Sequence, residues 1–391
     1  MSWKTIRADE FCESVRDGTH DTPKPNETGY KLVTGKHVKN GQIDPSDAYY
    51  ISEKDYKKIN ERSLVEQWDV LMSMIGTVGE VAVVKDHPNY AIKNVALFKC
   101  GGSELKGKWL AYYLRSSDAQ GHMSGNQKGS SQQFLSLNQL RSLPIPITDE
   151  RYMQRVIDIL SAYDELIENN QKQIKLLEEA AQRLYKEWFV DLRFPGHETT
   201  PIVDGVPEGW REQPLYQIAD VVMGQSPKSE YYNQVGEGLP FHQGVGSYGN
   251  RFVSDETYST SFTRIAEAGS ILFSVRAPVG RLNLTKNKVV IGRGLAAINH
   301  RRGAQSYLFY LLKEKFFRDD IIGNGSIFAS ISKEELLNQK FLIPLDSLVG
   351  QFNGIAGGID KKIDILSEQI RLLTEARNRL LPKLMSGEIE V

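Results

Sequence analysis

The chain contains little cysteine and no long apolar run. Cys12 and Cys100 are its two cysteines among 391 residues, too few for a disulfide framework or a cysteine-based zinc cluster. No segment approaches 18 consecutive apolar residues, so we predict no membrane-spanning helix. The first residues, MSWKTIRADEF, lack the apolar stretch of a signal peptide. These absences favour a cytoplasmic protein.

A surplus of charge of one sign is also lacking. The 48 Lys and Arg residues nearly balance the 49 Asp and Glu residues, which leaves a formal net charge of −1. Any affinity for nucleic acid must therefore come from local clusters of basic residues rather than from the total charge. The 40% of hydrophobic residues is ordinary for a globular protein, and a chain of this length suits two or three domains.

The sequence offers no recognisable catalytic or metal-binding motif. The seven histidines are scattered without a His-x-x-x-His pair, and the carboxylates are not clustered. The segment GSELKGK (102–108) resembles a phosphate-binding loop, but Trp109 stands where Ser or Thr would bind magnesium. The segment GVGSYG (244–249) has the Gly-x-Gly-x-x-Gly spacing, but no helical pattern follows it, and the Asn/Asp-Pro-Pro-Tyr/Phe motif of adenine methyltransferases is absent. We therefore predict that the chain is not an enzyme and binds neither a metal nor a cofactor.

What the chain does contain is an internal repeat. The segment LLEEAAQRL (176–184) recurs as LLTEARNRL (372–380), 196 residues later. Upstream, DVLMSMIGTVGEV (69–81) resembles SILFSVRAPVGRL (270–282), and DGTHDTPK (17–24) corresponds to MGQSPK (223–228). A repeat of this size predicts two copies of one structural unit.

Each copy ends in a heptad pattern whose apolar positions alternate at spacings of four and three, typical of a coiled-coil seam. The first seam runs from Val156 to Trp188 and the second from Phe352 to Leu384. Two unrelated surface helices would not share this register. Asn170 and Arg377 also fall on the seams, where a polar side chain can fix the register. The apolar residues predicted to pack between the helices are Leu160, Ile167, Ile174, Leu177, Leu184, Ile359, Ile363, Leu366, Ile370, Leu373 and Leu380.

The rest of each copy has the pattern of an α+β domain. Strand-like runs such as VLMSMI, NVALFK, SILFSV and KVVIG are each rich in β-branched or large apolar residues. We predict a first globular domain at 1–148, a helix at 149–193, a linker at 194–210, a second globular domain at 211–346 and a second helix at 347–386.

Two matched helices can bury their apolar stripes against each other, most simply about a pseudo-two-fold axis that makes them antiparallel. The first seam covers 33 residues, roughly 50 Å of helix. We expect such a pair to hold two similar but unlike domains apart, and DNA is the obvious polymer with features at fixed spacing.

Local charge differs between the two domains. The segment 264–302 contains eight basic residues and one acidic residue, a balance of +7, which suits contacts to phosphates and guanines. The corresponding segment of the first domain, 64–101, contains three basic and four acidic residues. The two domains therefore differ where readers of different DNA sequences would differ.

These features together resemble the specificity subunit of a type I restriction–modification enzyme. The resemblance covers nearly the whole chain and rests on the duplicated heptad helices, on YKEWFVDLRFPGHE (185–198) and on LLPKLMSGEIEV (380–391). The exits LPIPI (143–147) and LIPL (342–345) from the two domains also fit.

The resemblance implies two target-recognition domains, each reading one half of a split, asymmetric DNA site, and a helical pair that sets the spacer. It also implies a non-catalytic chain whose partners are double-stranded DNA, two methylation subunits that bind S-adenosylmethionine, and restriction subunits that use ATP and Mg. Partner subunits would methylate adenine, or translocate and cleave the DNA.

Loop residues near the glycines of each domain are our candidates for DNA contact, because Gln and Arg can read base edges while Lys and Ser more often hold phosphates. In the first domain they are Thr22, Lys24, Lys36, His37, Lys128, Gln132 and Gln133, and in the second they are Ser226, Lys228, His242, Arg276, Arg281 and Arg293.

Two other classes of protein compete with this interpretation. A coiled-coil scaffold could use its two domains to bind proteins, although the basic segment and the asymmetry between the domains argue against it. A self-sufficient DNA methyltransferase would need the cofactor and base-gripping motifs that the sequence lacks.

Overall fold

The computed structural model describes residues 3–76, 78–124, 135–316 and 330–391. The chain divides into two compact units, one made of residues 1–170 and 368–391 and the other of residues 171–367. Each unit contains one α+β domain and parts of two long helices, α6 (Glu150–Tyr185) and α10 (Asp346–Ser386). The predicted fold class is therefore confirmed, whereas the exact domain boundaries stay a prediction.

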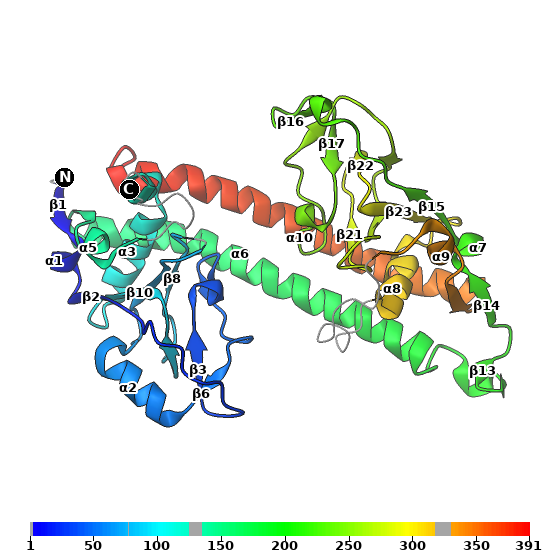
Figure 1. Cartoon of the computed structure of the whole chain (residues 1–391), viewed down its shortest axis with the longest axis horizontal. Coiled ribbons are helices and arrows are strands. Elements are labelled where there is room, and N and C mark those ends of the chain that lie inside the picture. Colours follow the sequence, from blue (N-terminus) through cyan, green and yellow to red (C-terminus); the bar gives the residue numbers. More distant parts are fainter. Residues whose placement is uncertain (1–2, 77, 125–134, 317–329) are drawn as a thin grey trace. The chain divides into compact units, whose positions relative to one another are not determined.

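Two sheets of three or more strands occur among the described residues of the first unit. One is antiparallel, in the order β2 (Ser14–Asp17), β10 (Val95–Lys99), β7 (Val70–Ser73) and β8 (Val81–Val83). The other contains β6 (Tyr50–Ile51), β3 (Tyr30–Val33) and β9 (Tyr90–Ile92), with β3 and β9 parallel. Helix α2 (Glu53–Ser63) packs beside this second sheet (Figure 1), where the Tyr56 ring stacks on Tyr30.

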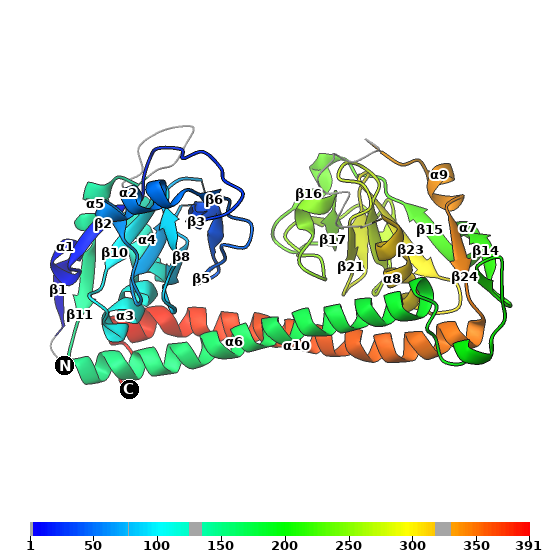
Figure 2. The same ribbon diagram turned by 90° about the horizontal axis from the view of Figure 1, so that it is seen from below.

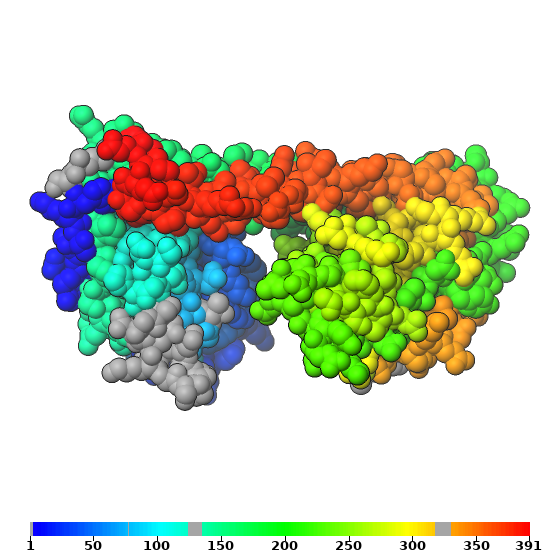
Figure 3. Space-filling model, turned by 90° about the horizontal axis from the view of Figure 1, so that it is seen from above, coloured from blue at the N-terminus to red at the C-terminus, as the bar shows by residue number. Residues whose placement is uncertain are grey.

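Helix α3 (Glu104–Arg115) joins the first domain to the long helices (Figure 2). Its Trp109, Leu110 and Tyr112 are buried in one cluster with Tyr152, Val156 and Leu160 of α6 and with Leu381 and Leu384 of α10. In Figure 3 the red end of α10 lies directly over the cyan part of this domain. The strands β1 (Lys4–Arg7) and β11 (Pro144–Ile147) pair antiparallel where the chain enters and leaves the domain.

The second unit repeats this topology with two more strands in its second sheet. Its antiparallel sheet has the order β15 (Ala219–Met223), β23 (Leu295–His300), β20 (Ile271–Ser274) and β21 (Leu282–Leu284). A second sheet contains β16 (Tyr232–Asn233), β18 (Tyr258–Ser259), β17 (Leu239–His242), β22 (Val289–Ile291) and β19 (Ile265–Ala266), with β17 and β22 parallel. Helix α8 (Gln305–Phe316) takes the place of α3, and β14 (Arg211–Pro214) pairs with β24 (Lys340–Ile343).

The region predicted as a linker contains structure of its own. A short π-helix (Lys186–Val190) ends α6, and β12 (Ile202–Val203) and β13 (Val206–Pro207) form a hairpin. The tight turn between these strands is Asp204-Gly205, whose residues both have positive φ. A two-residue Asp-Gly turn fits the twist of a hairpin, so this sequence signal was available in 194–210.

The long helices run antiparallel within each unit. In the first unit the Tyr152 hydroxyl, near the start of α6, donates to the Leu384 carbonyl near the end of α10 at 3.0 Å. In the second unit the Tyr185 ring, at the end of α6, meets the Phe352 ring near the start of α10 at 5.7 Å between centroids. Each unit thus confirms the predicted direction of pairing.

Candidate nucleic-acid interface

Several loops of the second domain meet at one end of its sheets. Four strands finish at this end, β15, β17, β20 and β22, and β23 begins there. This arrangement follows because β17 and β22 are parallel, whereas β23 runs antiparallel to both β15 and β20. Backbone hydrogen bonds join the loops. Gly224 N donates to Leu295 O at 2.9 Å, Gln225 N donates to Ile291 O at 2.9 Å, and Gly292 N donates to His242 O at 2.8 Å. We call this end, made of the loops at 224–228, 243–244, 275–281 and 292–294, the loop end of the domain.

Glycines allow the loops to come this close. A Cβ at Gly224 would lie 2.1 Å from the Gly292 carbonyl oxygen, and a Cβ at Gly294 would lie 2.5 Å from the Gln243 carbonyl oxygen. Both separations are too short for a real Cβ atom. Only glycine, which has no side chain, therefore fits at these two positions.

Polar side chains with defined partners occupy the loop end. The Ser226 hydroxyl donates to Gln243 Oε1 at 2.8 Å and accepts from the Arg293 backbone N–H at 3.2 Å. The side chains of Gln243 and Arg293 are exposed, as are those of Lys228 and Arg276 in neighbouring loops. This set of donors and cations on a rigid backbone suits contact with the phosphates and base edges of DNA.

The first domain has the same loop end with different side chains. Gly18 N donates to Val95 O at 2.9 Å, Thr19 N to Ile92 O at 3.0 Å and Lys93 N to Val33 O at 2.9 Å, the counterparts of the three bonds in the second domain. Here the Lys93 ammonium contacts the Thr22 hydroxyl. Position 34, after β3, corresponds to position 243 after β17, so the first domain presents Thr34 where the second presents Gln243.

Among the predicted contact residues, Thr22, Lys36, Ser226, Lys228, Arg276 and Arg293 lie at the two loop ends, and Lys24 follows in the first loop of the first domain. Thr22, Lys24, Lys36, Lys228, Arg276 and Arg293 are exposed and Ser226 is half-buried, although Lys36 is engaged by Asp47 at 2.8 Å. Lys128, Gln132 and Gln133 lie outside the described residues. DNA contact by any of these side chains stays a prediction.

Two of the predicted histidines are interior side chains. His37 is 4% exposed and its Nδ1 accepts from the Thr34 backbone N–H at 2.8 Å. His242 is 1% exposed and its Nε2 lies 3.1 Å from Asp255, an interaction that lowers the pKa of that carboxyl. Both imidazoles support the loops from inside their domains, so we correct their assignment as direct DNA contacts.

Arg281 is the last residue of the 275–281 loop, directly before β21. It lines a cavity of about 370 Å³ together with Glu178 of α6, Tyr248, Arg251 and Phe309. The guanidinium of Arg251 lies 3.8 Å from the Phe309 ring centroid and pairs with Asp360 of α10. Burial raises the pKa of the nearby Glu178 carboxyl, opposed mainly by the charge of Arg251. These contacts attach the second domain to its parts of the long helices.

Four of the eight basic residues in the segment 264–302 form ion pairs. Lys286 pairs with Asp364, Lys288 with Glu267, Arg301 with Asp220 and Arg302 with Asp346. Arg276 and Arg293, in contrast, form no ion pair with a residue that the structure describes. The charge available for phosphates is therefore concentrated on a few arginines rather than spread along the segment.

Reasoning from sequence missed Gln243, Lys93 and Thr34. Each adjoins a strand of the parallel pair β3–β9 or β17–β22, which joins segments far apart in the sequence. Hydrophobic patterns identify strands but not which strands lie parallel to each other. The glycines at 292 and 294 were a usable signal, since glycines that flank a lone arginine mark a close approach of backbone.

The predicted seam residues are all buried or half-buried. Leu160, Ile363 and Leu366 are at most 2% exposed, whereas the apolar residues Leu166, Leu176 and Leu372, outside the seam, are at least 50% exposed. The heptad register therefore distinguishes the inner from the outer face of these helices correctly.

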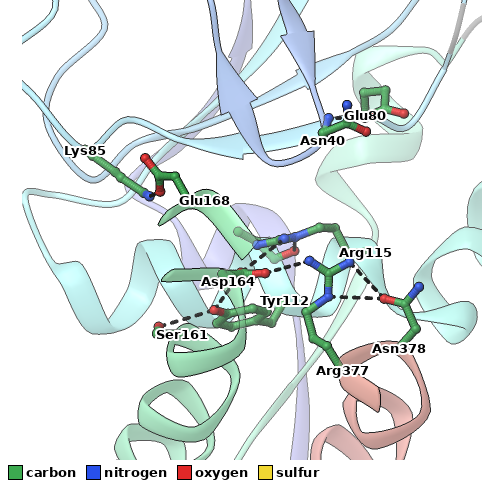
Figure 4. A network of polar contacts seen from close by, with 11 residues as sticks. Asn40, Glu80, Lys85, Tyr112, Arg115, Ser161, Asp164, Glu168, Arg377 and Asn378 are labelled. Carbon is green, nitrogen blue, oxygen red and sulfur yellow. Dashed lines mark hydrogen bonds and ion pairs between the residues drawn. The ribbon is translucent and has the colours of Figure 1, made fainter. Parts of the chain in front are cut away.

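The two polar seam residues have partners across the helix pair of the first unit. Asn170 donates to Gln369 at 3.3 Å. Arg377 of α10 donates to Asp164 of α6 at 2.6 Å, and the same carboxylate accepts from the Tyr112 hydroxyl at 3.0 Å and from Arg115 at 3.4 Å (Figure 4). Another ion pair, from Lys85 to Glu168 at 2.8 Å, lies one turn further along α6. Asp164 thus ties α3 of the domain to both long helices.

Metal-binding and membrane-spanning features are absent from the part of the chain that the structure describes. No three His, Cys, Asp or Glu side chains among these residues come together as metal ligands would. None of the described helices is both long and apolar enough to cross a bilayer.

Comparison with known proteins agrees with the duplicated architecture. The family described as type I restriction modification DNA specificity domain matches residues 1–179 and again residues 207–377. The chain is 28% identical to a protein of Methanocaldococcus jannaschii that is described as a type I restriction enzyme MjaX specificity subunit. The alignment covers the whole of this chain and 94% of that protein. It is 24% identical to the MjaIX specificity subunit of the same organism, over 87% of this chain and 82% of that one.

A solved structure also shares the fold. The crystal structure of the S subunit of a type I restriction–modification system from M. genitalium superposes with a TM-score of 0.58 at 16% identity, covering 98% of this chain and 96% of that one. The family match covers both copies of the repeat, including the loop ends and most of the helical seams. The chain therefore belongs to the family of type I restriction–modification DNA specificity subunits.

Proposed function

We propose that each domain reads one half of a split, asymmetric DNA site through its loop end. One observation carries this proposal: the same backbone framework occurs in both domains, held by matching hydrogen bonds, while the side chains that it presents differ. A shared framework with Gln243 and Arg293 in one copy and Thr34 and Lys93 in the other suits two related domains that bind different sequences.

The spacer between the two halves follows from the helices. α6 contains 36 residues and α10 contains 41, and each domain is attached to both of them within its own unit. The Asp164 network in the first unit and the Arg251–Asp360 pair in the second join domain to helix by charged hydrogen bonds. A domain attached in this way holds its loop end at a fixed orientation to the helices.

The chain supplies recognition and its partners supply the chemistry. Methylation subunits would bind S-adenosylmethionine and modify adenine, and restriction subunits would use ATP and Mg. Apolar side chains on the outer faces of the long helices support the docking of such partners: Leu176, Ile355 and Ile365 of the second unit are between 48% and 64% exposed.

A binding titration of the complex with its methylation subunits tests the proposal. We expect tight binding to a duplex that contains both half-sites, weak binding when either half is scrambled, and an affinity that falls steeply with salt because phosphates are neutralised. Equal affinity for scrambled and intact duplexes would contradict sequence recognition. Loss of all DNA binding by a correctly assembled complex would favour a protein scaffold.

A further inference from the structure

We propose that Gln243 reads an adenine in the major groove of the half-site bound by the second domain, and that Ser226 positions it. This inference rests on the proposed function and names one reading residue and its base. It depends on the contacts of three residues, Ser226, Gln243 and Arg293, which come from three different loops.

The backbone around Gln243 is rigid. Gly294 N donates to the Gln243 carbonyl at 3.1 Å, and Gly292 N donates to the His242 carbonyl at 2.8 Å. The glycine at 292 packs so closely that a Cβ there would lie 2.9 Å from the Gln243 Cα. The root of the glutamine side chain therefore has a fixed position at the loop end.

A chain of hydrogen bonds orients the amide. The Arg293 backbone N–H donates to the Ser226 hydroxyl, which donates in turn to Gln243 Oε1 at 2.8 Å. In this series of hydrogen bonds the backbone N–H donates, the serine hydroxyl accepts once and donates once, and the amide oxygen accepts. The side chain of Gln243 is exposed although its amide oxygen is held.

The groups that remain match adenine. Oε1 retains a second lone pair, and Nε2 retains both hydrogens because it forms no hydrogen bond with the described residues. Adenine presents the N6 amino donor and the N7 acceptor side by side in the major groove, the pattern that glutamine reads with two bonds. Guanine presents two acceptors there and would leave Oε1 without a donor.

The neighbouring cations suit the DNA backbone. Arg276, Arg293 and Lys228 are exposed in loops of the same loop end. Contacts from such cations to phosphates would position the duplex, and Gln243 would supply the discrimination. The first domain has Thr34 at the equivalent position. Its single hydroxyl lies 3.2 Å from His37 Nδ1 and lacks the paired oxygen and amino group of an amide, so Thr34 cannot form the same two hydrogen bonds with adenine.

The test uses the methyltransferase complex assembled with the full chain. Once the recognised site is known, each adenine of the second half-site is replaced in turn by 7-deazaadenine, which removes the N7 acceptor but keeps the base pair. We expect one such replacement to weaken binding of the unaltered complex about 5- to 150-fold. The same replacement should have little effect on a complex carrying Gln243→Leu.

Two further variants sharpen the test. Gln243→Glu should shift the preference at that position toward cytosine, whose N4 amino group donates to a carboxylate. Ser226→Ala should weaken the discrimination without abolishing it, because the amide loses its orientation. Gln234→Ala is the matched control, since this exposed glutamine precedes β17 and lies toward the other end of that strand from Gln243.

The outcomes separate this inference from the proposed function. If Gln243→Leu keeps full discrimination at every position of the site, Gln243 does not read a base, even though the complex still recognises its sequence. If the unaltered complex itself shows no sequence preference, the proposed function fails first.

Discussion

Arg276 differs from half of the cations of the 264–302 segment because no described carboxylate neutralises it. It follows β20 in the loop end, and its backbone forms an isolated bridge with Ser330 that holds this loop in place. An exposed arginine on an anchored loop is suited to phosphate contact.

We predict that Arg276→Ala weakens binding to the recognised site and lowers the salt slope of log affinity by about 1, as expected for one lost phosphate contact. A gel-shift titration at several fixed salt concentrations measures both quantities. Arg302→Ala is the control, because Arg302 is paired with Asp346. Unchanged affinity and unchanged salt slope in Arg276→Ala would exclude this residue from the interface.

His37 gives the first loop end a dependence on pH. Burial lowers the pKa of its imidazole, with the charge of Lys36 acting in the same direction and Asp47 and Asp44 opposing. The folded state therefore favours the neutral ring, whose Nδ1 accepts from the Thr34 N–H. The stability due to this preference is present above the ordinary histidine pKa of about 6.5 and is lost as the pH falls below it.

We predict that the free energy of unfolding of the unaltered chain, compared with that of His37→Gln, falls as the pH is lowered from 7.5 to 5.5. Glutamine does not titrate in this range, so the difference between the two proteins isolates His37 from His300, whose pKa burial also lowers. Urea unfolding at each pH measures the difference. A difference that stays constant with pH would show that His37 does not couple to folding.

At the scale of elements, the helix pair joins two kinds of contact: an apolar seam and a few charged bridges. Asp164 is the centre of the charged contacts in the first unit, and it is about one quarter exposed while its partner Arg377 is 19% exposed. Partly buried charges lose much of their hydration, so removing one leaves its partners poorly compensated.

We predict that Asp164→Asn lowers the free energy of unfolding by about 1–3 kcal/mol, because Arg377 and Arg115 lose a shared carboxylate. Glu165→Gln is the matched control, since Glu165 is the exposed next residue on the same helix. Chemical unfolding of both variants gives the comparison. Equal stability of the two variants would mean that the Asp164 network does not hold the domain.

The apolar seam is tested separately. Leu160 is fully buried and Leu166, six residues later on α6, is half exposed. We predict that Leu160→Ala destabilises the chain by about 2–5 kcal/mol and that Leu166→Ala costs less than about 1 kcal/mol. Similar losses for both leucines in urea unfolding would contradict the assigned register.

The elements were more predictable than the loop ends, for physical reasons. A heptad pattern repeats over many turns, so it predicted both long helices, their inner face and, through the repeat, their antiparallel pairing. Buried strands such as VLMSMI and SILFSV were equally clear from their apolar runs. The partners Gln243 and Ser226 come together only through a parallel strand pair that no local pattern encodes.

Burial was the second limit. His37 ends a short 3-10 helix and His242 ends β17, each next to glycine-containing loops, and histidine is a residue type found both buried and exposed. The structure places both inside their domains, where each has a specific partner. The sequence identifies each residue near a loop, but it does not show whether the side chain points into the domain or toward the solvent.

At the scale of the whole molecule, the duplication explains the proposed function. Two domains of one topology present different side chains on the same backbone, and each is anchored to the same two helices within its own unit. A protein built in this way should specify a target in two parts and leave the bases between them unread.

Sequencing of methylated adenines across the genome of cells that contain this chain and its methylation subunits tests this claim most directly. The account predicts one motif with two specified halves of unlike sequence, separated by a spacer of constant length and unspecified bases. A single continuous motif, two identical halves or a spacer of variable length would contradict it.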